Sequence, residues 1–192
     1  NIGQKSINPE KSETNELYGE YNFSENIKFS STAYRTRMKD RIKIKSDWSA
    51  YENKTPHTIQ EGLESEITWS GNDQSVSLVS HFAKSRTATG GPNSRRPDLS
   101  YGIDYSKKIN LPEYGAFDLN FNHRYIGDHI DWTGSENAFV KSVDLVDLSI
   151  SKSLFGSVFT LNITNLLNER YEKPATYSQD GRQFRLGFTR LY

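Results

Sequence analysis

The chain has 192 residues, equal numbers of basic and acidic side chains (24 each) and no cysteine. These features exclude a disulfide scaffold, a cysteine-based metal site and a basic patch of the kind that nucleic acid requires. No apolar run approaches the roughly 20 residues of a transmembrane helix. A membrane barrel remains open, because only every second residue of a barrel strand meets lipid.

Apolar and polar residues alternate through most of the chain, as expected for β-strands with two unlike faces. Near Tyr34 the alternation becomes uncertain. Ile42 and Ile44 are even-numbered, whereas the preceding apolar residues of this strand are odd-numbered. We expect a bulge, or an extension of the strand beyond a bilayer, to account for the change. The pattern predicts nine strands, at about residues 16–23, 27–33, 58–69, 76–82, 99–106, 117–124, 146–151, 159–164 and 183–189.

The connections between these strands alternate in length. Short turns are predicted at residues 24–26, 71–73, 110–115 and 155–157, and long loops at residues 46–56, 88–97, 129–142 and 172–181. A soluble β-sandwich follows no such rule, whereas a membrane barrel has short turns on one side and longer outer loops on the other. The alternation therefore favours an antiparallel transmembrane β-barrel over a sandwich.

Charged residues occur in mid-strand on the polar side of the alternation. In a sandwich they form the solvent face, and in a barrel they line a wide, wet lumen. They are Glu64, Glu66, Asp104, Asp118, Arg124 and Asp147.

The strand count indicates a partial barrel. Bacterial single-chain barrels have an even number of strands. If the long loops are outside, the first of the nine strands starts from the outer side. We therefore expect residues 1–192 to be the C-terminal portion of a barrel whose earlier strands lie upstream.

Several short stretches resemble TonB-dependent outer-membrane receptors of the siderophore, vitamin B12 and colicin I type. The most specific is Asn165-Leu166-Leu167-Asn168-Glu169-Arg170-Tyr171, close to the C-terminus. The others are Asn8-Pro9-Glu10-Lys11-Ser12, Ala33-Tyr34, Asp40-Arg41-Ile42, Tyr51-Glu52-Asn53, Gly62-Leu63-Glu64, Arg96-Pro97, Val146-Asp147-Leu148 and Gly181-Arg182 with Phe184. The resemblance covers nearly the whole chain.

The resemblance implies a 22-stranded barrel around an N-terminal plug, of which this chain would hold about the last nine strands. It further implies an outer-membrane receptor for energy-coupled uptake of a scarce chelate, most simply a ferric siderophore. The implied partners are outer-membrane lipid, the upstream strands and plug, and a TonB-type energy-coupling protein acting through the upstream part. A passive porin-like channel and a soluble β-sandwich binding module are the alternatives.

The sequence contains no enzyme motif. Its histidines, at positions 57, 81, 123 and 129, lack the spacing of a metal site, and no serine lies in a nucleophile elbow. We therefore expect no catalytic activity, no metal site and no cofactor.

The long loops carry the candidate ligand-binding residues. Arginine together with tyrosine and tryptophan suits ligands that are anionic and aromatic, as many ferric siderophores are. The alternative is that such residues only contact lipopolysaccharide or solvent. The candidates are Arg86, Arg95, Arg96, Trp132 and Tyr177.

Overall fold

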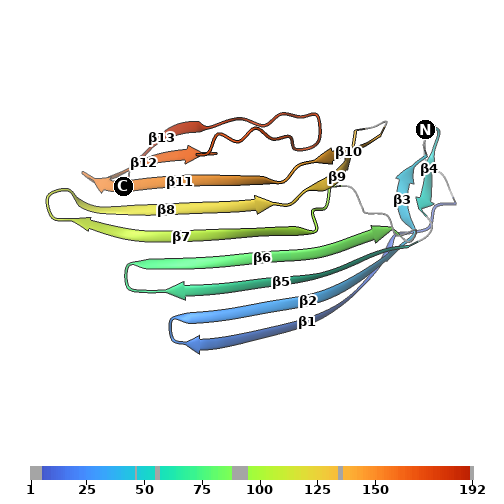
Figure 1. Cartoon of the computed structure of the whole chain (residues 1–192), viewed down its shortest axis with the longest axis horizontal. Coiled ribbons are helices and arrows are strands. Elements are labelled where there is room, and N and C mark those ends of the chain that lie inside the picture. The colour runs from blue at the N-terminus through green and yellow to red at the C-terminus, as the bar shows by residue number, and fades with distance from the viewer. Residues whose placement is uncertain (1–5, 46, 55–56, 88–94, 134–135, 191–192) are drawn as a thin grey trace.

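The computed structural model describes residues 6–45, 47–54, 57–87, 95–133 and 136–190. Nine strands of these residues form one antiparallel sheet with the order β1-β2-β5-β6-β7-β8-β11-β12-β13 (Figure 1). No helix within these ranges could cross a membrane. The nine strands are β1 (Lys11–Ser24), β2 (Ile27–Lys39), β5 (Thr58–Ser70), β6 (Gln74–Thr87), β7 (Leu99–Leu111), β8 (Gly115–Ile126), β11 (Val143–Leu154), β12 (Ser157–Thr164) and β13 (Gln183–Arg190).

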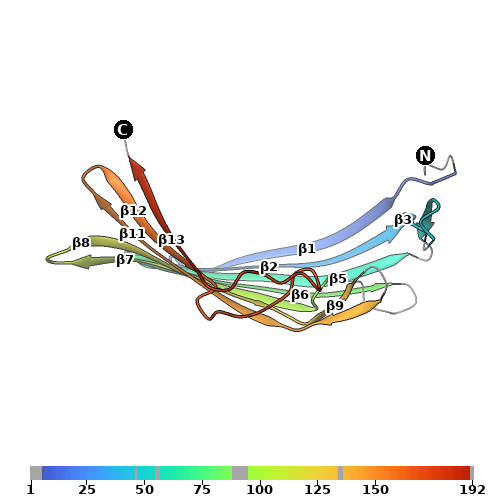
Figure 2. The same ribbon diagram turned by 90° about the horizontal axis from the view of Figure 1, so that it is seen from above.

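Each of the nine predicted strands is confirmed, and the tight turns gather at one end of the sheet (Figure 1). The sheet is strongly curved and does not close on itself (Figure 2). Among the described strands, β1 and β13 each have a paired neighbour on one side only. The fold is thus a partial barrel wall with two open edges.

Two β-hairpins occur where long loops were expected: one has its first strand just before the loop predicted at 46–56, and the other lies within the loop predicted at 129–142. In the first, β3 (Arg41–Ile44) pairs with β4 (Tyr51–Lys54) as a separate two-stranded sheet. Asp40, with φ of 54°, turns the chain out of β2, so the parity change at Ile42 comes from a separate hairpin and not from a bulge. In the second, β9 (His129–Trp132) pairs with β10 (Asn137–Val140).

The strand register places the predicted apolar residues on one continuous face. One apolar row crosses eight strands, because each residue in it is the direct cross-strand partner of the next. The row is Ile27, Trp69, Val76, Tyr105, Phe121, Leu148, Ile163 and Phe184. We call this side of the sheet the apolar face and the other side the polar face.

The apolar face is bare, which rules out a soluble sandwich for the described part of the chain. A sandwich buries this face against a second sheet, but no second layer covers it within the described residues. On the interior strands β5 and β6, Leu63 and Phe82 are each 46% exposed. Such a surface is stable only against another apolar medium, as the lipid-facing wall of a barrel is.

The polar face is ordered by side-chain hydrogen bonds. Tyr34 of β2 lies across Gly62 of β5, and its hydroxyl is 2.9 Å from Nε2 of His81 on β6. Gln60 donates its amide to the same hydroxyl at 3.2 Å. Glycine at position 62 leaves the room that this ring occupies, since a Cβ there would lie 2.5 Å from the Tyr34 hydroxyl.

We predict that Gly62→Ala destabilises the wall. The methyl group would displace the Tyr34 ring and break its bonds to His81 and Gln60, at a cost of roughly 1–3 kcal/mol. The measurement is the thermal midpoint of the full-length protein in detergent. Gly19→Ala is the matched control, because a Cβ at Gly19 meets nothing within 4 Å. Equal midpoints for the two variants would contradict this reading of Gly62.

Candidate functional site

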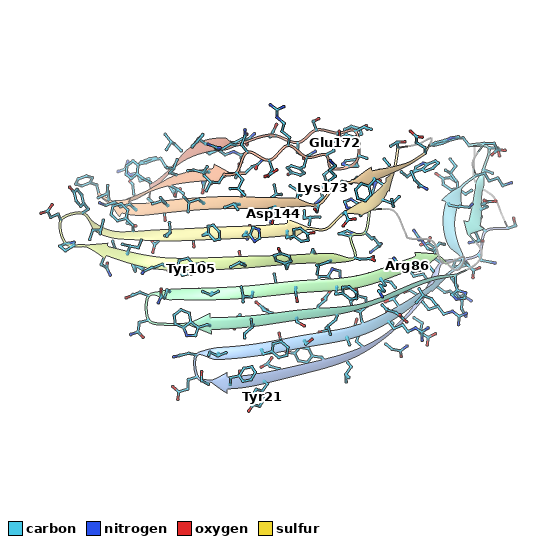
Figure 3. The ribbon with its side chains drawn as sticks, viewed as in Figure 1. Tyr21, Arg86, Tyr105, Asp144, Glu172 and Lys173 are labelled. Atoms are coloured by element: carbon cyan, nitrogen blue, oxygen red, sulfur yellow. The ribbon has the colours of Figure 1, made fainter. Side chains whose placement is uncertain are left out.

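Three of the long connections meet at the end of the sheet opposite the tight turns. They are the residues before β7, the β9–β10 hairpin and the segment between β12 and β13. Arg86 and the pair Glu172 and Lys173 mark this end of the sheet in Figure 3. We call Arg95, Ile130, Asp131, Trp132 and Ala175 the loop junction.

Asp131 is the centre of the loop junction. Its side chain is fully buried. Nε of Arg95 lies 2.5 Å from its Oδ1, and the Ala175 amide donates to its Oδ2 at 2.8 Å. The amide of Trp132 donates to Oδ1 at 2.6 Å. One carboxylate therefore ties together three connections that are far apart in the sequence.

The backbone supports the same contacts. The Arg95 amide donates to the carbonyl oxygen of Ile130 at 2.7 Å, and Arg95 has a φ of 63°. A non-glycine residue rarely adopts this left-handed conformation without compensating contacts. The two bonds of Arg95 to the β9–β10 hairpin supply that compensation.

The charge of Asp131 is stabilised in place. Burial by itself would raise the pKa of the carboxyl, but bonds from the Ala175 amide, Arg95 and the Trp132 amide outweigh burial and lower it. Because the pKa is lower in the folded state, the ionised carboxylate stabilises the junction at pH values above its ordinary pKa of 3.8. That contribution is lost as the pH falls through the lowered value.

The five predicted ligand-binding residues all lie near this end of the sheet, in different surroundings. Arg86 forms a two-point ion pair with Asp98, at 3.2 and 2.8 Å, and shares the apolar face with Ile59, its cross-strand partner. Arg95 belongs to the loop junction. Arg96 is exposed, as are Trp132 (48%) and Tyr177 (66%).

The segment between β12 and β13 is shaped by the asparagines of the Asn165–Tyr171 motif. Asn165 is buried, and its side chain donates to the carbonyls of Glu169 (2.9 Å) and Asp180 (3.2 Å) and accepts from the Glu169 amide at 2.9 Å. Its own amide donates to Asp147 of β11 at 2.9 Å. The motif thus anchors the connection to the polar face of the wall.

Asn168 completes this anchor. Its Oδ1 accepts the Arg182 amide at 3.0 Å. A Cβ at Gly181 would lie 2.6 Å from the same oxygen, so this approach requires glycine. Both asparagines have positive φ, 50° at Asn165 and 57° at Asn168, a conformation that asparagine tolerates.

The described residues of the loop junction offer a surface of mixed chemistry. No group of three or more metal-ligating side chains occurs there. The exposed groups of this surface are aromatic rings and guanidinium groups, and they surround the buried carboxylate of Asp131. Such a surface suits an anionic ligand with flat groups. Sequence patterns alone did not single out Asp131.

Comparison with known proteins identifies the family. Residues 1–166 match the family described as TonB dependent receptor-like, beta-barrel. The chain belongs to this family. The resemblance found in the sequence motifs is therefore confirmed, and with it the location, because barrels of this family lie in the outer membrane.

Solved TonB-dependent receptors share the fold. The ferripyoverdine receptor of Pseudomonas aeruginosa aligns with a TM-score of 0.80 at 14% identity, over 96% of this chain and 27% of that one. The ferric yersiniabactin uptake receptor of Yersinia pestis aligns with a TM-score of 0.76 at 17% identity, over 93% of this chain and 28% of that one. The ferric-catecholate import receptor of E. coli K12 aligns with a TM-score of 0.73 at 16% identity, over 96% of this chain and 28% of that one.

This TonB-dependent receptor chain therefore spans between a quarter and a third of the length of those three structures. A search of curated protein sequences finds no match. The family consists of receptors and not of enzymes.

We predict that Asp131→Asn loosens the loop junction. Asparagine has the same shape but lacks the charge and one of the two acceptor oxygens. At least one of the bonds from Arg95 and the two amides is therefore lost and the others weaken, by about 2–3 kcal/mol of local stability. Hydrogen exchange of the Trp132 and Ala175 amides in the full-length protein should accelerate correspondingly. Asp128→Asn, three residues earlier and exposed, is the control. Unchanged protection in Asp131→Asn would show that the carboxylate does not hold the loops.

Proposed function

We propose that this chain is part of an energy-coupled outer-membrane receptor that takes up a ferric siderophore or a similar chelate. The family match over residues 1–166 carries the proposal. The similar solved structures are named as receptors for ferripyoverdine, ferric yersiniabactin and ferric catecholates, which supports an iron chelate as the ligand class.

The loop junction provides the physical basis for ligand capture. A ligand that arrives from outside meets Trp132, Tyr177 and Arg96, which are exposed around a rigid centre. Hydrogen bonds to Asp131 join these connections, and connections held together in this way lose less entropy on binding. In this proposal Arg95 positions the loops through Asp131. Arg86 is paired with Asp98 on the apolar face and takes no part in this capture surface.

The polar face supports passage of a hydrophilic cargo. Serine, asparagine and acidic side chains lie on the polar face of the wall, among them Asn120, Asn122 and Asp147. The proposal includes an upstream plug and a TonB-type energy-coupling protein, as the resemblance implies. A passive porin-like channel is the competing proposal, and it differs in requiring no energy source.

The decisive experiment is uptake of radioactive iron by iron-limited cells. A strain that lacks the full-length protein is compared with a complemented strain, with a panel of ferric chelates and with a protonophore. We expect uptake of one chelate class, restored by complementation and abolished by the protonophore. Uptake that survives the protonophore would favour the passive channel, and no chelate uptake would overturn the proposal.

We predict that Trp132→Ala combined with Tyr177→Ala weakens binding of the transported chelate at least tenfold, because two exposed aromatic contacts are lost. The measurement is equilibrium binding to cells kept de-energised, so that transport does not interfere. Tyr114→Ala is the control, because Tyr114 is 63% exposed but lies on a tight turn at the opposite end of the sheet. Equal affinities for the variants and the parent would remove these two residues from the site.

A further inference from the structure

The β3–β4 hairpin is a sheet of its own at the loop end of the wall, and its two faces differ in chemistry (Figure 1). Cross-strand partners in a hairpin point to the same side. The apolar residues therefore share one side, which we call the isoleucine face: Ile42, Ile44, Tyr51 and Asn53. The charged residues share the other side, which we call the charged face: Arg41, Lys43, Glu52 and Lys54.

The two faces of the hairpin are about equally open to solvent. Ile42 and Tyr51 are 43% and 39% exposed. The side chains of Lys43 and Glu52, which form an ion pair at 3.0 Å, are 49% and 38% exposed. A two-stranded hairpin is at best marginally stable in water unless one of its faces packs on another element. Among the described residues, the isoleucine face lacks such a covering element.

The chain that enters β1 already lies against the isoleucine face. The Asn8 amide donates to Oδ1 of Asn53 at 2.8 Å, and Nδ2 of Asn53 donates to the Asn8 carbonyl oxygen at 2.9 Å. The Ile42 amide donates to Oε1 of Glu10 at 2.6 Å. Asn53 thus binds both backbone groups of one residue, as a neighbouring strand would.

Followed backwards, the entering chain rises along the hairpin toward its tip. Lys11 begins β1 beside the base of the hairpin. Asn8, three residues earlier, has reached the level of Asn53. The other pair of the isoleucine face, Ile44 with Tyr51, lies two residues further along the hairpin, which is roughly 7 Å. A short continuation of the same chain segment is enough to cover it.

We propose that the outer loop preceding residue 6 packs on the isoleucine face and forms one outer lobe with the β3–β4 hairpin. The inference rests on the proposed function in one respect, namely that barrel strands precede this chain in the full-length receptor. Two observations select this occupant over a bound chelate. The open side chains of the face are apolar, and Asn8, which is already bound to it, continues directly into the proposed segment.

The test is cysteine labelling of the full-length, ligand-free receptor, because residues 1–192 contain no cysteine. Ile42→Cys and Tyr51→Cys are made singly and treated with a bulky maleimide, both on cells and in detergent. Lys43→Cys and Glu52→Cys, on the charged face, are the matched controls. A docked segment must open before the thiol can react, so the isoleucine-face cysteines should react at least about tenfold more slowly than the controls.

Hydrogen exchange provides a measurement without added cysteines, in case a cysteine variant distorts the hairpin. The segment preceding residue 6 should be protected in the parent receptor. Asn53→Ala removes the side chain that holds Asn8, so exchange in that segment should accelerate by about tenfold. Asn72→Ala, on a tight turn at the other end of the wall, is the control and should leave the exchange unchanged.

A photoactivatable maleimide attached to Tyr51→Cys identifies what covers the face. We expect the cross-linked peptide, read by mass spectrometry, to precede residue 6. A cross-link to another part of the receptor would overturn the proposal. Protection on cells that is lost in detergent would also overturn it, because the occupant would then be a lipid or another component of the cell surface.

Equal labelling of the two hairpin faces, together with unprotected exchange in the preceding segment, would show that the isoleucine face is open. That result would contradict the proposal directly. None of these readouts depends on transport. A failure of the lobe is therefore distinct from a failure of the proposed function, which would appear as absent chelate uptake.

Discussion

The rest of this structure depends on the continuous backbone hydrogen bonds between nine adjacent strands. These bonds also keep the alternation of side chains between the two faces in step from strand to strand. In hydrocarbon no water can satisfy an unpaired amide or carbonyl, so a membrane wall must pair its strands continuously. Continuous pairing also fixes which residues share a face, because a slip by one residue would move every side chain to the other side. The apolar row from Ile27 to Phe184 shows that no such slip occurs between β2 and β13. Between β1 and β2 the register shifts only beside the turn, between Asn22 and Ser24.

The chemistry of both faces of the wall follows from this parity. The strands extend beyond the apolar residues at their loop ends, where the same alternation places the cations of Arg35 and Arg37 on the apolar face. It places the hydrogen-bonding side chains of Tyr34 and Gln60 on the polar face. Beyond the strands, the connections lose the support of the ladder. There a single buried carboxylate, Asp131, and the two asparagines at 165 and 168 order the chain.

The strands could be predicted from sequence because the period of two and the turn residues are local signals. The parity change at Ile42 and Ile44 was also visible, but its cause was not, since it depends on the left-handed conformation of Asp40. The β9–β10 hairpin was expected as a loop because its strands are only four residues long. Asp131 has no local signal, since Arg95 and Ala175 lie 36 and 44 residues away in the chain.

The motif Asn165–Tyr171, unlike Asp131, has a clear signal in the local sequence. Sequence resemblance picked it out as the most specific stretch, and the structure supplies the physical reason. Asn165 connects β11, the turn and Asp180 through four hydrogen bonds, while Asn168 fits only beside a glycine at position 181. Replacing a residue that serves several partners at once breaks several hydrogen bonds together, which makes such a residue costly to exchange.

Arginine placed at mid-strand on either face of the wall shows most directly whether the apolar face meets lipid. Leu148 lies in the apolar row, and Asn120 lies on the polar face beside Ser149. The measurement is the free energy of unfolding of each full-length variant in lipid bilayers. Leu148→Arg should cost roughly 2–4 kcal/mol because the charge enters hydrocarbon, and Asn120→Arg should cost little. Equal or reversed costs would mean that the apolar face does not meet lipid.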